Sequence, residues 1–280
     1  MSDNESDNYS LEEEGDENSG LPTYSAEEIA DTFLDFYKFL TTLHYNAADL
    51  KVAPEEGWGE LIPDNYAEIK SEEVLEVLRR LPYFKHNNQA FHYKSYLVDY
   101  TAVERDFFDE EDERMEYLEI WCNDGEIVDQ KHCIHIAWGY ESGGREFVLN
   151  VLHGEITEDM LEVNQLDFKD IPSFFDELKE QYRTLKLIPC IGRETLEADS
   201  VPEREDEVTE EEFKAQTEEN FPTDLDIQYI RQLYRKHGWP EAFRREECFR
   251  AAKELSDSLE AQGRYGWPEV DESMSHVRQG

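Results

Sequence analysis

The stretch HIAWGYESGGREFVLNV, residues 135–151, decides the fold that we expect of this chain, because three glycines lie between two apolar runs. Both runs are rich in the β-branched and aromatic residues that favour strands. A phosphate-binding loop would lead from its glycines into a helix, whereas FVLNV follows here and Glu141 would repel a phosphate. The stretch therefore predicts a β-hairpin with Gly143 and Gly144 at positive φ in its turn.

Strand-like segments continue on both sides of this hairpin, and turn-forming residues such as His153-Gly154 separate them. The segments expected to form strands are FHYKSYLVDYT (91–101), RMEYLEIWC (114–122), HCIHIAWGY (132–140), EFVLNVL (146–152) and EITEDML (155–161). Their short length and close spacing predict an antiparallel meander.

Helices are expected before and after the strands. Ser25 with Glu28 forms a capping box ahead of apolar residues at spacings of three and four. A second helix begins at Ser71 and ends before Pro82, and a third begins at Pro172-Ser173. The order predicts an α+β fold, with an antiparallel or mixed sheet flanked by helices and an additional C-terminal helical hairpin.

Changes in composition divide the chain into four parts. Residues 1–22 contain no Lys or Arg and few large apolar side chains, so we expect a disordered acidic tail. Residues 23–196 hold the α+β domain. Residues 197–222 crowd acidic residues around two prolines and predict a tether with one short helix around Phe213. Residues 223–280 predict a helical segment that could dock on the acidic domain through its interspersed arginines.

Acidic residues outnumber basic ones by 68 to 27, which gives a formal net charge of -41. Nucleic acids and anionic membranes bind through clustered Lys and Arg, so this charge excludes both as partners. It favours a protein partner with a basic surface, although the charge could equally serve solubility alone. No run of about 20 apolar residues could cross a bilayer, and the first residues lack the features of a signal peptide. We therefore expect a cytoplasmic or nuclear protein.

The residue types that often carry chemistry are sparse. Four cysteines are too few for a disulfide framework and are expected to be reduced core thiols. On a strand Cys133 and His135 share a face while His132 points away, and no CxxC or HxxxH spacing supplies further ligands. Neither a metal ion nor another cofactor is therefore predicted. The acidic run 107–117 lacks the spacing of an EF-hand and predicts a solvated loop.

Two functional hypotheses follow from the residues. In the first, loop tryptophans beside glycines act as binding anchors, because aromatic rings offer a large contact area at small entropic cost. The same rings could instead fold inward and fill the domain edge. In the second hypothesis the chain is a hydrolase that uses Cys133 as nucleophile and His135 as base. The candidate binding residues are Trp58, Trp138, Tyr140, Arg145 and Trp239.

The stretch GYESGGREFVLNVLHGEITEDM, followed by IPSFFDELKEQYRTL, resembles the closing half of the SMI1/KNR4 (SUKH) superfamily over residues 131–186. FYKFLTTLHYNAADLKV, EVLRRLPY, YRTLKLIPCIGRET and IRQLYRKHGWPEAFRREEC also look like an uncharacterised filamentous-fungal protein family without an established activity. The first resemblance implies a non-enzymatic protein-interaction module or scaffold, linked in fungi to cell-wall signalling and in bacteria to toxin neutralisation. The sequence leaves the oligomeric state open.

Overall fold

The computed structural model shows an α+β protein with antiparallel sheets, which confirms the expected fold class. The predicted tail up to residue 20, Cys122 and residues 265–280 lie outside the described residues. The structure describes residues 21–59, 64–85, 90–116, 118–120, 127–160, 167–190, 195–217 and 222–264.

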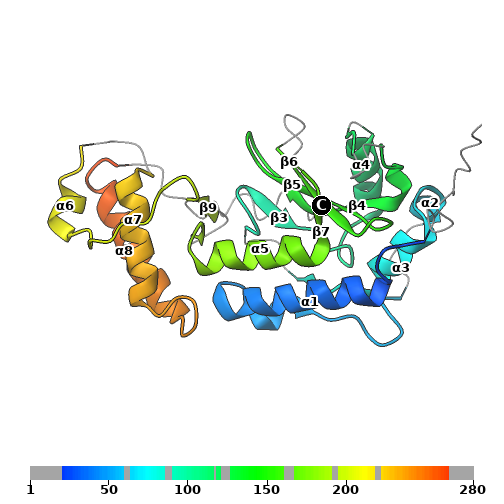
Figure 1. Ribbon diagram of the computed structural model, residues 1–280, viewed down its shortest axis with the longest axis horizontal. Coiled ribbons are helices and arrows are strands. Elements are labelled where there is room, and N and C mark those ends of the chain that lie inside the picture. The colour runs from blue at the N-terminus through cyan, green and yellow to red at the C-terminus, as the bar shows by residue number, and fades with distance from the viewer. Residues whose placement is uncertain are drawn as a thin grey trace, which may run out of the picture.

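A five-stranded antiparallel sheet forms the centre of the molecule, in the order β3-β4-β5-β6-β7 (Figure 1). Its strands are β3 (Ser95–Leu97), β4 (Cys133–Gly139), β5 (Glu146–Asn150), β6 (Glu155–Asp159) and β7 (Lys169–Asp170). The predicted hairpin is the pair β4 and β5, in which Ile134 lies opposite Leu149 and Cys133 opposite Asn150.

Two residues of the hairpin turn have positive φ, Gly143 at 80° and Glu141 at 60°. The prediction of positive φ is correct for Gly143 and wrong for Gly144. Gly144 is required for a different reason, because a Cβ there would lie 2.6 Å from the carbonyl oxygen of Tyr140 and 2.9 Å from that of Lys94. The backbone of the turn therefore packs too closely for any side chain at position 144.

Helices α1 (Ala26–Leu43) and α5 (Ile171–Arg183) lie side by side and cover one face of the sheet (Figure 1). The capping box of Ser25 and Glu28 opens α1 as predicted. Aromatic rings connect the layers: Phe36 stacks on Phe175 of α5 at 4.6 Å between centroids, and Phe91 meets Phe147 of β5 at 5.1 Å. This aromatic layer is the main core.

A smaller substructure flanks α1. Helix α3 (Glu72–Arg80) packs on α1, and its predicted start and end are confirmed, since Ser71 caps it and Leu81 ends it. The remaining elements here are the 3-10 turn η1 (Ala47–Asp49), β1 (Leu50–Lys51), α2 (Asp64–Ile69) and β2 (Tyr83–Phe84). Strands β1 and β2 pair antiparallel.

Helix α4 (Arg105–Met115) covers the second face of the sheet. The predicted solvated loop over 107–117 and the predicted strand over 114–122 are both wrong in their described residues, since α4 runs to Met115 and residues 118–120 form no strand. The buried residues of α4 are Phe108, Glu111 and Met115. One of these three buried residues is a carboxylate, so the sequence of α4 does not show a continuous apolar stripe and resembles that of a solvated segment.

The C-terminal part lies at one end of the elongated molecule (Figure 1). Two short strands lead into it, and the described part of residues 197–222 packs on α7, where the ring of Phe213 stacks on Tyr229 at 4.2 Å. Its elements are β8 (Leu187–Pro189), β9 (Thr195–Glu197), α6 (Glu210–Lys214), α7 (Asp224–Lys236) and α8 (Arg245–Glu260).

Arg231 of α7 connects this helical part to the α+β domain. Its guanidinium donates hydrogen bonds to three backbone carbonyls, those of Leu185 at 3.1 Å, Ala198 at 2.6 Å and Val201 at 2.8 Å. The side chain is only 2% exposed. The docking therefore depends on backbone carbonyls more than on the acidic side chains considered in the sequence.

Replacing Arg231 by Ala should lower the free energy of unfolding by about 3 kcal/mol or more, because three carbonyls would lose their charged donor. Urea unfolding followed by circular dichroism measures the change. Arg235→Ala is the matched control in the same helix: its side chain is 45% exposed and pairs with Glu203, so the loss should stay below about 1 kcal/mol. Equal losses in the two variants would contradict the role of Arg231.

Candidate functional site

Cys133 and His135 point to the same face of the sheet, as expected, and α4 covers that face. Both side chains are fully buried. Cys133 packs with Met115 of α4 and Val148 of β5. His132 points elsewhere, and its Nδ1 lies 3.1 Å from the hydroxyl of Ser71. The pair is therefore part of a packed layer.

Glu111 of α4 is the polar centre of this layer. Its Oε1 accepts hydrogen bonds from the hydroxyl of Tyr100 at 2.6 Å and from the backbone N–H of His135 at 2.9 Å. Its Oε2 accepts a hydrogen bond from the hydroxyl of Tyr66. One donor lies on α2, one follows β3 and one lies on β4. All three converge on one buried carboxylate, which fixes α4 on the sheet.

The imidazole of His135 lies between two carboxylates. Its Nδ1 is 3.5 Å from Glu111 Oε1, and its Nε2 is 3.6 Å from Glu146 Oε2. Glu146 also pairs with Arg114 of α4, whose guanidinium lies 4.4 Å above the ring of Trp138. We call Glu111, Arg114, His135 and Glu146 the buried charge cluster.

The pKa shifts define the charges in this cluster. Burial acts to raise the pKa of Glu111, but the hydrogen bond from His135 and the charge of Lys70 outweigh it and hold this pKa at about 2. Burial lowers the pKa of His135 more than Glu111 raises it. At neutral pH the carboxylate is thus ionised and the imidazole neutral. A neutral imidazole could act as a base, but the buried side chains of Cys133 and His135 give a substrate no access.

The tryptophans of the candidate set pack against the core of the protein. Trp138 is fully buried and stacks on Phe107 of α4 at 4.6 Å. Trp239 is 5% exposed, and its indole N–H donates to the carbonyl of Tyr182 at 2.9 Å. Trp58 is half-buried and donates to the carbonyl of Leu81 at 2.8 Å.

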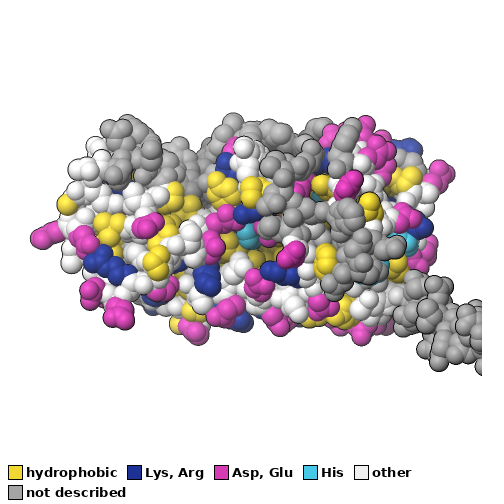
Figure 2. Space-filling view, turned by 45° about the horizontal axis from the view of Figure 1, so that its top comes forward, with side chains coloured by type: hydrophobic (Ala, Val, Ile, Leu, Met, Phe, Trp, Pro, Cys, Tyr) yellow, Lys and Arg dark blue, Asp and Glu magenta, His cyan; other side chains and the backbone are white. Residues whose placement is uncertain are grey.

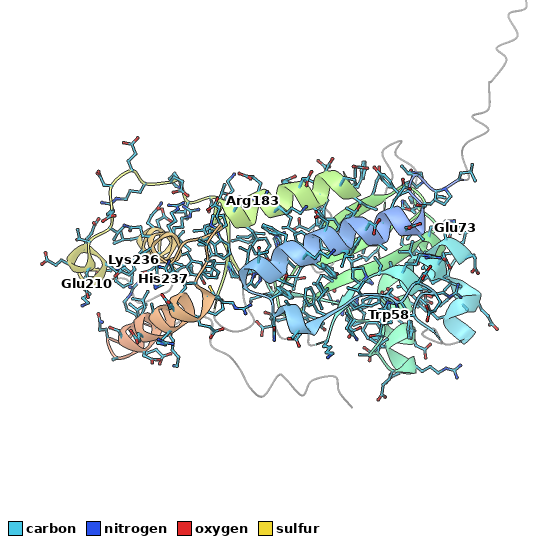
Figure 3. The ribbon with its side chains drawn as sticks, turned by 90° about the horizontal axis from the view of Figure 1, so that it is seen from below. Trp58, Glu73, Arg183, Glu210, Lys236 and His237 are labelled. Atoms are coloured by element: carbon cyan, nitrogen blue, oxygen red, sulfur yellow. The ribbon has the colours of Figure 1, made fainter. Side chains whose placement is uncertain are left out.

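These candidates do not form one surface. Figure 3 shows Trp58 beside α3. His237, which precedes Trp239 by two residues, lies at the opposite end of the molecule in the same view. Tyr140 is half-buried, and its ring lies 6.1 Å from that of Tyr96. Arg145 pairs with Glu158, which lines a hollow in the surface.

Arg145, which directly precedes β5, forms ion pairs with residues of β6 and β9. Its guanidinium lies 3.3 Å from Glu158 of β6 and 3.0 Å from Glu197 of β9. Glu197 in turn lies 3.6 Å from Nδ1 of the buried His92. Arg145 therefore has two carboxylate partners within the molecule, and its side chain is only 14% exposed.

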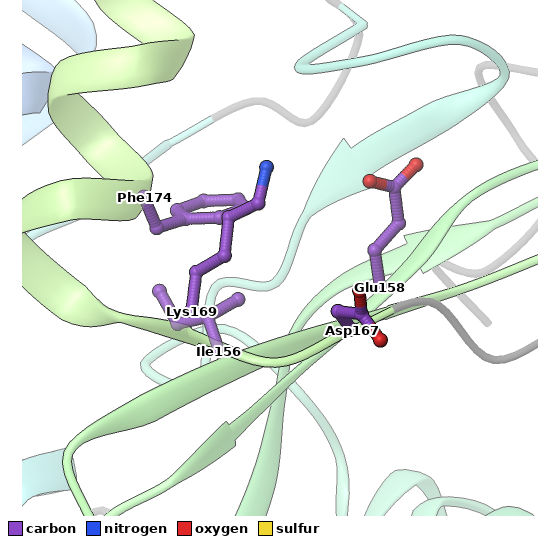
Figure 4. A pocket seen from close by; sticks show the side chains of 5 residues that line it. All are labelled: Ile156, Glu158, Asp167, Lys169 and Phe174. Carbon is purple, nitrogen blue, oxygen red and sulfur yellow. The ribbon is translucent and has the colours of Figure 1, made fainter. Parts of the chain in front are cut away.

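A hollow of about 230 Å³ lies next to Glu158, between β6, β7 and the start of α5 (Figure 4). Ile156 and Phe174, both buried, form its apolar floor. Glu158, Asp167 and Lys169 form its polar wall. Burial, followed by the charges of Glu197 and Glu177, raises the pKa of Glu158 although Arg145 and Lys169 act against it. We call these five lining residues the acidic hollow.

The sequence analysis missed the acidic hollow and the buried charge cluster. The sequence contained one signal for the hollow. Ile156 and Glu158 are two residues apart in a strand, so their side chains point to the same face of the sheet, the face that is packed against the core. The partners of these residues lie on other elements, on α4 for the buried charge cluster and on β7, the residues before it and α5 for the hollow.

Comparisons with known proteins add no assignment, since no family model, curated protein or solved structure matches the chain. Over the described residues, no helix is long and apolar enough to cross a membrane. In the same residues no group of three His, Cys, Asp or Glu side chains could hold a metal ion.

Buried histidines should make the protein less stable in mild acid. Burial lowers the pKa of His44 to about 3 and that of His92 to about 3, whereas the unfolded chain takes up these protons below about 6.5. Their stabilisation is thus complete above about pH 6.5 and is lost as the pH falls towards 3, by up to about 1.4 kcal/mol per pH unit for each histidine.

His44→Phe should remove one of these contributions. The ring of His44 packs 5.3 Å from that of Tyr182, so a phenyl ring suits the site. Between about pH 6 and pH 5, we expect the free energy of unfolding of the variant to depend on pH less steeply than that of the wild type, by about 1 kcal/mol per pH unit. Urea unfolding at several pH values measures both slopes, and identical slopes would contradict a neutral buried His44.

Proposed function

We propose that this chain is a non-enzymatic protein-interaction module or scaffold whose partner presents a basic surface. One observation carries the proposal: most described Lys and Arg side chains are already engaged with groups of the same chain, and the whole sequence has 68 Asp and Glu against 27 Lys and Arg. Figure 2 shows Asp and Glu side chains scattered over the described part of one face, with fewer Lys and Arg side chains among them. A cationic partner would compensate this surplus.

The way in which cations are used inside the molecule supports this view. Arg231 binds backbone carbonyls, and Arg264 forms a buried ion pair with Asp226 at 2.6 Å. Arg114 and Arg145 each pair with carboxylates at the faces of the sheet. These cations stabilise the fold and leave the outer carboxylates without equivalent compensation.

The burial of Cys133 and His135 supports a non-enzymatic role over the hydrolase hypothesis. A nucleophile and its base need access to a substrate, and both groups lie beneath α4. The resemblance to the SMI1/KNR4 superfamily points to the same class of function and stays part of the proposal. We also propose that the protein is located in the cytoplasm or nucleus, where basic proteins are available as partners.

Affinity capture from the native cell, followed by binding kinetics with the purified partner, tests the proposal. The association rate should fall as the salt concentration rises from about 0.05 M to about 0.5 M, because the Debye length shrinks and exposed charges are screened. Cys133→Ala should bind the partner as the wild type does, because the thiol lies in the core.

Two outcomes would contradict the proposal. An association rate that does not depend on salt would assign the charge of -41 to solubility. Turnover of a substrate that is lost in Cys133→Ala, with the fold intact by circular dichroism, would assign the chain to the hydrolases.

A further inference from the structure

We propose that the helical hairpin of α7 and α8 is an acid-sensitive element, which leaves the ends of α1 and α5 when His44 takes up a proton. The inference goes beyond the proposed function, because it concerns a conformational change within the chain. Figure 1 shows the hairpin at the end of the molecule where α1 and α5 finish. His44 is the residue that directly follows α1 there.

The hairpin is held at these helix ends by side chains that donate to backbone carbonyls. The indole N–H of Trp239 donates to the carbonyl of Tyr182 in the last turn of α5 at 2.9 Å. The guanidinium of Arg245 at the start of α8 donates to the carbonyl of Tyr45, just beyond α1, at 2.7 Å. Water can replace such donors once a contact opens. We call Tyr45, Tyr182, Trp239 and Arg245 the hairpin joint.

His44 lies at this joint without a counter-ion. It is 4% exposed, and its ring is 5.3 Å from that of Tyr182. Among the described residues no carboxylate lies within 4 Å of its ring nitrogens, whereas His92 and His135 each have one. The backbone of Ala90 faces the ring and favours a proton, but it carries no charge and does not meet the geometry of a hydrogen bond. A proton on His44 would therefore be a buried charge without compensation.

The charged and titratable groups around the ring add no compensation. Arg245 of α8 is a cation and acts against a proton on His44. Tyr45 beside it and Tyr182 of α5 stay neutral in acid, because burial raises the pKa of both hydroxyls. The docked hairpin thus favours the neutral imidazole.

Undocking reverses this preference. Burial, with the charge of Arg245, lowers the pKa of His44 to about 3 against the effect of Ala90. When the hairpin leaves, Arg245 moves away and water reaches the ring, so this pKa returns towards its ordinary value of about 6.5. Below about pH 6.5 the undocked form therefore binds one more proton than the docked form. The equilibrium constant for undocking should rise by up to about tenfold for each pH unit that is lost.

The undocked state would expose one of the candidate binding residues. Trp239 is 5% exposed at the joint. Its ring also lies 4.8 Å from that of Phe243 and 5.5 Å from that of Tyr234, both in the hairpin, so the hairpin can leave as one unit. Acid would thus turn a packed tryptophan into an aromatic contact surface.

Hydrogen exchange of the full chain, followed by mass spectrometry of its peptides, tests the inference at about pH 7 and about pH 5.5. Carboxylates with ordinary pKa values stay ionised over this range. After correction for the intrinsic effect of pH on exchange, the amides of α7 and α8 should lose protection about tenfold. They should exchange together and before the amides of β4 and β5, because the hairpin opens without the sheet.

Two variants identify the histidine that is responsible. His44→Phe should abolish the loss of protection in α7 and α8, since a phenyl ring takes up no proton. His92→Phe is the matched control: burial lowers the pKa of His92 to about 3 as well, but its ring lies 5.3 Å from Phe147 of β5 and not at the joint. This variant should keep the response of α7 and α8 that the wild type shows.

An undiminished response in His44→Phe would overturn the inference, and so would its loss in His92→Phe. The wild type alone supplies a further check. Exchange of α7, α8, β4 and β5 in a single step at about pH 5.5 would mean that the hairpin opens only when the whole protein unfolds.

Discussion

The structure depends on the burial of both faces of β4 and β5. All residues of these two strands are buried, and they alternate between an aromatic layer under α1 and α5 and a mixed layer under α4. The first layer needs only apolar packing. The second contains His135 and Glu146, so it can be closed only by a helix that carries matching polar groups. Glu111 and Arg114 of α4 supply them.

This constraint explains why residues that resemble a catalytic pair have a structural role. The ionised carboxylate of Glu111 accepts hydrogen bonds from Tyr66, Tyr100 and the backbone of His135, and Arg114 pairs with Glu146 in the same closed layer. Opening that layer to a substrate would expose Met115 and Val148 and leave Glu111 without its donors. The burial of Cys133 is therefore part of the packing on which the sheet depends.

Local signals in the sequence predicted much of the fold. The capping box at Ser25, the apolar spacing of α1 and the β-branched and aromatic runs of the hairpin are complete within one segment each. Helix α4 was missed because its buried face includes a carboxylate whose partners come from Tyr66, Tyr100 and His135. The acidic hollow was missed for the same reason, since tertiary contacts bring its walls together.

The central claim is that α4 encloses the second face of the sheet and buries Cys133 and His135 there. Thiol labelling of the folded protein, with the modified residue identified by mass spectrometry, tests this claim most directly. Cys133 should react only as fast as the protein unfolds, because its side chain is fully buried in the native state. Rapid, stoichiometric labelling of Cys133 at neutral pH in the folded protein would contradict it.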